Sequence, residues 1–130
     1  MGLFNKIKDK NYLAGFDNWL DSLSFEPMDD NVVSFCFNIY EDGVDKWSIE
    51  LVGCSSFSED DDDWACDEVT DFRTRENNYA WTEKANWEDI KEKCVKAVSK
   101  YLKNGKYSKI LQSKRAIAVG FVDGDLSIIK

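Results

Sequence analysis

The sequence lacks histidine altogether and has one proline and four cysteines among its 130 residues. The absence of histidine excludes Ser-His-Asp triads, histidine general bases and zinc sites that use histidine. The cysteines are well separated and form no C-x-x-C pair, so without a secretion signal we expect reduced, partly buried thiols. No apolar run approaches the ~18–20 residues needed to span a bilayer. These absences remove most common enzyme classes and predict a protein that binds rather than catalyses.

The first ten residues carry no recognisable targeting signal. Charged residues interrupt any apolar segment between Met1 and Lys10, so a signal peptide is not expected. Lys6 stands where a myristoylation motif beginning at Gly2 needs Ser or Thr. We therefore expect a cytoplasmic protein.

What the sequence does contain is one concentrated block of negative charge. Ser58 to Asp71 reads S-E-D-D-D-D-W-A-C-D-E-V-T-D and holds eight acidic residues with no Lys or Arg. The whole chain has 25 acidic and 17 basic residues, so this stretch accounts for the entire net charge of −8. It is the feature that any function has to explain.

Three interpretations of this stretch are open. Blocks of like charge usually stay in water as a solvated loop. Clustered oxygen ligands also suit Ca²⁺, but the EF-hand spacing is absent because Trp64 and Ala65 stand where later ligands and the glycine belong. The third interpretation is a docking surface for a basic partner, which Trp47, Trp64 and Trp81 favour because tryptophan often anchors protein interfaces. We predict no metal ion and no other cofactor.

Two helices are predicted from apolar stripes. In residues 3–23 the apolar side chains recur at spacings of three and four, and Gly15 marks a break in the helix. Asn86 is a candidate N-cap for a second helix that runs to about Lys103 and stops at Asn104-Gly105. Its predicted inner stripe is Trp87, Ile90, Cys94, Val98 and Tyr101. A short helical turn is expected within residues 106–113.

Strands are predicted where apolar residues alternate. Residues 32–40 and 46–54 form an antiparallel hairpin, residues 66–72 return as a third strand, and residues 73–84 form an edge strand or ordered loop. At the C-terminus, Asp123-Gly124 separates two apolar runs, which is typical of a type I′ hairpin. That turn pairs Val119 with Ile128 and leaves Gly120 on a face where something packs closely.

These elements together predict a single α+β domain covering residues 1–130. It has a mainly antiparallel sheet, an N-terminal helix, and a second helix before a C-terminal β-hairpin.

Candidate chemistry is sparse. Asp67 with Glu68 or Asp71 is the only carboxylate pair that suggests glycoside hydrolysis, and neighbours on one strand do not flank a substrate. No glycine-rich phosphate loop is present. Residues 72–130 hold 13 bases and seven acids, and the basic surplus lies mostly on the second helix and in the stretch after it. We interpret it as a solvated helix face rather than a nucleic-acid site. We predict that the protein is not an enzyme.

A small, acidic, histidine-free α+β protein with a D-D-D-D-W-A-C-D-E run resembles the immunity proteins of bacterial polymorphic toxin systems. Such proteins neutralise a cognate toxin, often a basic nuclease, by binding it through an acidic surface. The resemblance implies a basic protein partner, with no direct contact to nucleic acid or membrane. It implies contacts through Asp60, Asp61, Asp62, Asp63, Trp64, Asp67, Glu68 and Asp71.

Two other functions remain open at this point. The same acidity suits a nucleic-acid mimic that inhibits a DNA- or RNA-binding enzyme. A regulatory binding module unrelated to toxins would also fit.

Overall fold

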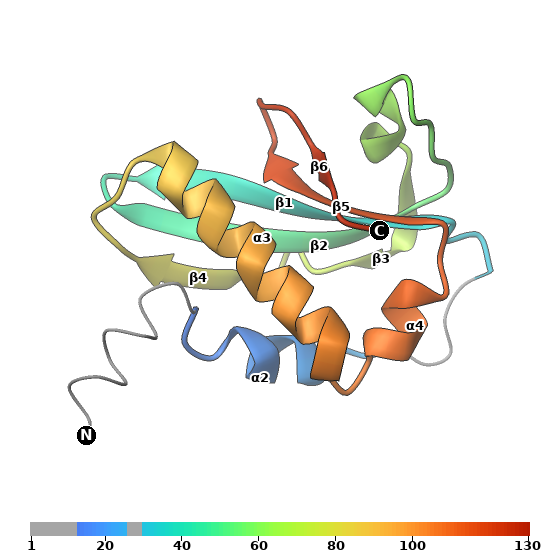
Figure 1. Ribbon diagram of the computed structural model, residues 1–130, viewed down its shortest axis with the longest axis horizontal. Helices are drawn as coiled ribbons and strands as arrows, with labels where there is room; N and C mark the ends of the chain where they lie inside the picture. The colour runs from blue at the N-terminus through green and yellow to red at the C-terminus, as the bar shows by residue number, and fades with distance from the viewer. Residues whose placement is uncertain (1–12, 26–29) are drawn as a thin grey trace.

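A computed structural model describes residues 13–25 and 30–130, and these residues form a six-stranded sheet with helices packed against it (Figure 1). The elements in chain order are α2 (Phe16–Asp21), β1 (Ser34–Gly43), β2 (Lys46–Cys54), η2 (Asp62–Cys66), β3 (Glu68–Arg73), β4 (Tyr79–Thr82), α3 (Trp87–Asn104), α4 (Ser108–Gln112), β5 (Ala116–Phe121) and β6 (Ser127–Ile128). The predicted α+β class is confirmed, including the helix that precedes the C-terminal strands.

The sheet is mainly antiparallel, with one parallel pair at its centre. The strand order is β3-β2-β1-β5-β6. Strand β4 also pairs with β2, at residues 46–49, whereas β3 pairs with β2 at residues 52–54. Strands β1 and β5 run parallel, with Ile39 opposite Phe121. The sequence pattern did not predict this parallel pair. Its consequence is that β1 and β5 end side by side.

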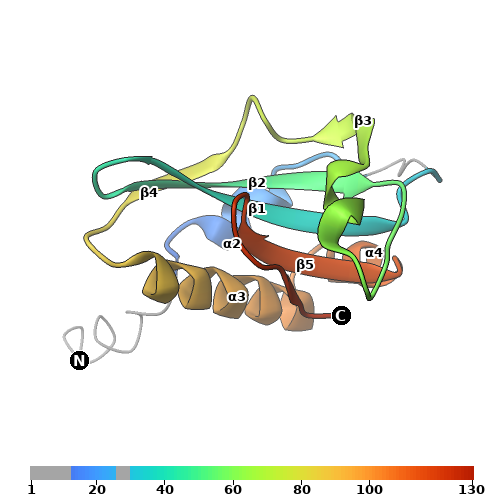
Figure 2. The ribbon, with the colours of Figure 1, turned by 90° about the horizontal axis from the view of Figure 1, so that it is seen from above.

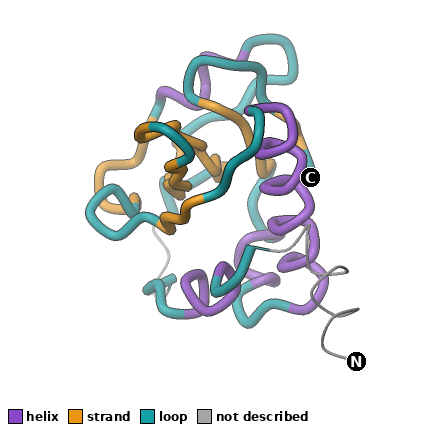
Figure 3. The backbone as a smooth tube through the Cα atoms, turned by 90° about the vertical axis from the view of Figure 1, so that its left-hand side faces the viewer, coloured by secondary structure: helices purple, strands orange, loops and turns teal. Residues whose placement is uncertain are grey.

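Helices α2, α3 and α4 cover one face of the sheet. Figure 2 shows α3 running beneath the strands, and Figure 3, which looks along them, shows α3 passing down one side. The apolar side chains that alternate toward this face are buried against the helices; they include Phe35, Phe37, Ile39, Trp47, Ile49, Leu51, Ile117 and Val119. No helix among the described residues is both long and apolar enough to cross a membrane.

Within the described residues, the predicted N-terminal helix is represented by α2. Gly15 has φ 78°, a left-handed conformation that favours glycine, and α2 begins directly after it. The apolar stripe predicted for this helix is buried: Leu13, Phe16, Trp19, Leu20 and Leu23. The part of the predicted helix before Leu13 lies outside the described residues. The start of α2 directly after Gly15 agrees with the predicted break at this position.

Helix α3 begins and ends where the sequence predicts. The Asn86 side chain accepts a hydrogen bond from the Asp89 backbone N–H at 2.8 Å, and the helix stops before Gly105. Lys96 pairs with Glu92, one turn earlier on the helix, at 3.0 Å. Lys93 pairs with Glu83 on the loop that precedes the helix.

The C-terminal hairpin is present, but its turn and register differ from the prediction. Gly124 does not have the positive φ that a type I′ turn requires, and its N–H bonds the Phe121 carbonyl instead. Five residues therefore connect β5 to β6, and Ile128 pairs with Ala118 rather than Val119. The one-residue shift leaves Ile128 46% exposed.

The second face of the sheet is also covered, although by a loop rather than a helix. Side chains that point away from the helices form a smaller buried cluster: Cys36, Val52, Cys54, Ala118 and Trp64. The first four belong to β1, β2 and β5, whereas Trp64 comes from η2 within the acidic stretch. The central strands are therefore buried on both faces.

We predict opposite outcomes for two glycines of the C-terminal hairpin. A Cβ at Gly120 would lie 2.7 Å from the Asp125 carbonyl oxygen, whereas a Cβ at Gly124 would meet nothing closer than 3.6 Å. Gly120→Ala should lower the free energy of unfolding by about 1–3 kcal/mol, because the hairpin backbone must shift. Gly124→Ala should leave it nearly unchanged. Urea unfolding of both variants checks this, and equal changes in the free energy of unfolding would contradict the turn described here.

The thiols give a second prediction. Cys36, Cys54 and Cys94 are buried thiols, and burial raises the pKa of Cys94 to about 12. These thiols should react slowly with a disulfide reagent in the native protein because burial makes them inaccessible. Under denaturing conditions all four cysteines should react. A denatured count below four would contradict the reduced state.

Candidate functional site: an acidic surface around the C-terminal hairpin loop

The tetra-aspartate run has a defined backbone conformation. It leads into the 3-10 helix η2, and the Asp61 side chain caps this helix by accepting a hydrogen bond from the Asp63 N–H at 2.9 Å. Carboxylates are favourable at this position because the first N–H groups of a helix have no partner within it. The side chains of Asp60, Asp61, Asp62 and Asp63 are exposed. The run is therefore displayed at a fixed place on the molecule.

Trp64 holds this loop onto the sheet. Its indole is 3% exposed, packs in the second-face cluster and lies 5.3 Å from the Phe57 ring. The Cys54 thiol donates to the Ala65 carbonyl at 3.8 Å, and the Ser34 hydroxyl donates to the Ser56 carbonyl at 2.7 Å. A side chain this buried does not reach a partner. The prediction of Trp64 as a contact residue is therefore corrected: Trp64 belongs to the core.

The other predicted contact residues divide into two groups. Asp67 is exposed and accepts a hydrogen bond from the Ser56 hydroxyl at 2.7 Å. Glu68 and Asp71 belong to β3, and their side chains lie outside those the structure describes. Of the predicted contact residues, the aspartates at 60–63 and Asp67 are therefore the ones that the structure describes as exposed.

A hollow joins the acidic run to the C-terminal hairpin loop. Its volume is about 550 Å³, and its acidic lining residues are Asp62 and Asp63 from η2 and Asp123 from the loop between β5 and β6. Val122, which precedes Asp123 on this loop and is 48% exposed, also lines the hollow. Segments that are far apart in sequence therefore contribute carboxylates to one depression.

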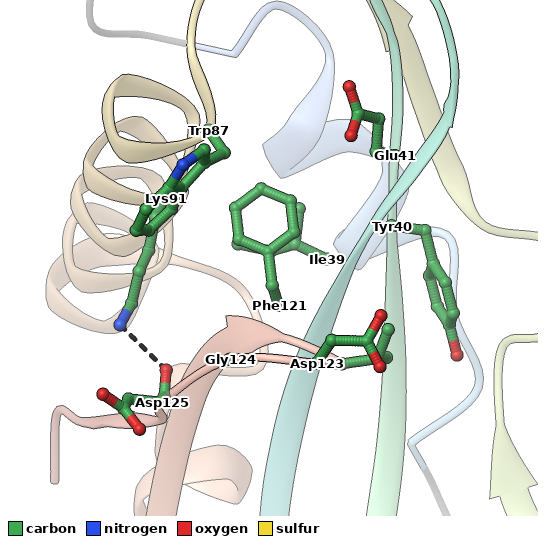
Figure 4. A pocket seen from close by; sticks show the side chains of 10 residues that line it. Ile39, Tyr40, Glu41, Trp87, Lys91, Phe121, Asp123, Gly124 and Asp125 are labelled. Carbon is green, nitrogen blue, oxygen red and sulfur yellow. Dashed lines mark hydrogen bonds between the residues drawn. The ribbon is translucent and has the colours of Figure 1, made fainter.

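A second hollow, of about 770 Å³, lies beside the same loop (Figure 4). Ile39 and Phe121 line its apolar part, Glu41 comes from the end of β1, and Trp87 comes from the first residue of α3. We call the carboxylates that line the two hollows the acidic surface: Glu41, Asp62, Asp63, Asp123 and Asp125.

Trp87 is the exposed tryptophan of this region. Its predicted place on the inner stripe of α3 is wrong, because 60% of the residue is exposed. The four other members of that stripe are buried, but the first turn of α3 extends beyond the buried core, and Trp87 meets the Phe121 ring edge-on at 6.3 Å. The periodic pattern shows which side chains share one face of the helix. It does not show where that face extends beyond the buried core.

From the sequence, Asp123 is predicted only as a turn residue, and nothing singles out Glu41. Their proximity follows from the parallel pairing of β1 with β5, which brings the two strand ends together. No local sequence signal marks this pairing. The sequence feature that could have pointed to Asp123 is the Asp-Gly loop next to an apolar strand.

Glu50 is a buried carboxylate elsewhere on the sheet, and it is fully paired. It is 1% exposed and receives two hydrogen bonds from Arg75, at 2.8 and 3.1 Å, and one from the Tyr40 hydroxyl at 3.1 Å. A buried charge needs such partners because its desolvation is costly. The pair ties the loop after β3 to β2, which is a structural role.

Among the described residues, no group of three or more acidic, Cys or His side chains is arranged to hold a metal ion. Comparisons of the chain with protein-family models, with curated proteins and with solved structures found no match. The functional argument therefore depends on the geometry of the acidic surface.

We predict that the two tryptophans exchange the roles expected of them. Trp64→Ala should lower the free energy of unfolding by about 3–5 kcal/mol, because it leaves a cavity in the second-face cluster. Trp87→Ala should cost less than about 1 kcal/mol, because most of this side chain is in water. Chemical unfolding monitored by circular dichroism measures both. Equal losses, or a larger loss for Trp87→Ala, would contradict this assignment.

Proposed function

We propose that this protein binds and neutralises a basic protein, as a bacterial immunity protein does with its toxin, and that it binds through the acidic surface. The observation that carries the proposal is the convergence of carboxylates from β1, η2 and the β5–β6 loop around two adjoining hollows. Electrostatic complementarity of this kind steers encounter and selects a partner of opposite charge.

Exposed apolar groups next to the carboxylates support binding to a protein. Trp87 and Val122 are among the exposed large hydrophobic residues, and both line the second hollow, of about 770 Å³. Charges alone accelerate association but contribute little holding energy, whereas an aromatic side chain that is desolvated in a complex is a frequent hot spot. A toxin with nuclease activity fits as partner because proteins that bind nucleic acid present basic surfaces.

The proposal places the protein in the cytoplasm and gives it no catalytic role. Three buried cysteines are thiols rather than disulfides, as is usual in reducing compartments. Its action is occlusion of a partner.

The first test compares charge removal at two places. We expect the partner to be recoverable by affinity purification from the native host and identifiable by mass spectrometry. A triple variant with Asp62→Asn, Asp63→Asn and Asp123→Asn should then associate about tenfold more slowly at low salt, with a flatter salt dependence, because steering is lost. Surface plasmon resonance at several salt concentrations measures both rates.

A matched control removes the same charge elsewhere. Asp30→Asn, Glu76→Gln and Glu92→Gln change three exposed acids that line neither hollow. This variant should associate at nearly the wild-type rate. If both triple variants slow association equally, net charge alone is responsible and the acidic surface is not the binding site.

Competition with DNA or RNA for the purified partner separates neutralisation of a toxin from nucleic-acid mimicry. Four consecutive exposed aspartates at residues 60–63 are the observation that favours mimicry. A mimic occupies the nucleic-acid site of its target, so DNA or RNA should displace it competitively. An immunity protein that binds away from that site should form a ternary complex instead.

A further inference from the structure

We propose that the hollow beside Trp87 receives an arginine side chain of the basic partner, an inference that rests on the proposed function. Figure 4 shows Trp87 on one side of the hollow and the carboxylates of Glu41 and Asp123 on the other, with the Phe121 ring between them. The occupant must therefore satisfy an aromatic wall, an apolar floor and an acidic rim together.

The aromatic wall is available to a ligand. Trp87 is 60% exposed, and its ring meets that of Phe121 edge-on, with 6.3 Å between the centroids and 85° between the planes. Cations are attracted to aromatic faces, most strongly to the indole of tryptophan. A guanidinium group is planar and weakly hydrated, so it stacks on such a face more readily than a lysine ammonium does.

The acidic rim selects a cation. Glu41 and Asp123 are exposed, and neither has an ion pair to another described residue. An apolar occupant would desolvate both carboxylates without compensation, and an anion would be repelled. A guanidinium can donate two parallel hydrogen bonds to one carboxylate while its plane remains against the indole.

One cation of the protein already lines this hollow, and its role is local. The Lys91 ammonium donates to the Asp125 backbone carbonyl at 2.8 Å. In Figure 4 this contact lies across the hollow from Glu41. Lys91 thus fixes the loop that carries Asp123 and leaves the Glu41 side to the partner.

The size of the hollow agrees with a side chain and its flanking backbone. Its volume of about 770 Å³ lies within the ~300–1,000 Å³ usual for ligand sites. We therefore assign the hollow to an arginine-bearing segment of the partner.

The test uses a blocked tripeptide, acetyl-Gly-Arg-Gly-amide, and the full-length ¹⁵N-labelled protein. Titration should shift the indole N–H resonance of Trp87, which is assigned by its loss in Trp87→Phe. The citrulline peptide has nearly the same shape without charge and should bind at least tenfold more weakly. A lysine peptide should fall between the two, because it keeps the charge but stacks poorly.

Two double variants locate the site. Glu41→Gln with Asp123→Asn should weaken arginine-peptide binding at least tenfold, while Asp30→Asn with Glu76→Gln should leave it unchanged. The dispersion of the same spectra reports whether each variant is folded. The citrulline comparison needs no variant.

Failure of this inference is distinguishable from failure of the proposed function. Equal shifts from arginine and citrulline peptides, or shifts that spare Trp87, would overturn the arginine site. The acidic surface would still stand if the Asp62, Asp63 and Asp123 triple variant slowed association with the purified partner while its matched control did not.

Discussion

The packing of Trp64 on the second face of the sheet is the contact on which the acidic surface depends. Strands β1, β2 and β5 present Cys36, Val52, Cys54 and Ala118 on the face away from the helices, and these groups need a cover. The indole supplies it from the middle of an acidic stretch. Truncating a buried aromatic typically costs ~3–5 kcal/mol, whereas two charges 4 Å apart in water repel by only ~1 kcal/mol. Burial of one side chain therefore outweighs the repulsion within any one pair of neighbouring carboxylates.

The parallel pairing of β1 with β5 is the second constraint, because it determines which loops meet. With Ile39 opposite Phe121, the chain leaves both strands at the same end of the sheet. Glu41 and the loop at residues 122–126 emerge together there, and η2 approaches the other side of that loop. Gly120 permits this arrangement, because the backbone of Asp125 and Leu126 occupies the place of its missing side chain.

Local features were predictable from sequence because their causes are local. Asn86 caps α3 through its own side chain, α2 begins directly after Gly15 with its positive φ, and the hairpin of β1 and β2 follows from alternation. Long-range choices were not predictable. Alternation shows that Cys36 and Phe37 point to opposite faces, but it does not say that a loop covers one face and helices the other. For the same reason, Trp64 and Trp87 were each assigned the environment of the other.

The arrangement also explains how a chain with many lysines can present an acidic field. Outside residues 58–71 the acidic and basic residues are equal in number, at 17 each. Exposed lysines such as Lys96, Lys100 and Lys103 lie on α3, which packs on the face of the sheet opposite η2. A helix layer and a sheet together separate two such surfaces by ~10 Å or more, which exceeds the Debye length of ~8 Å at physiological ionic strength. An approaching basic surface therefore meets the carboxylates with the lysines largely screened. The position of the charges on the fold, more than their total, determines where the molecule presents negative charge.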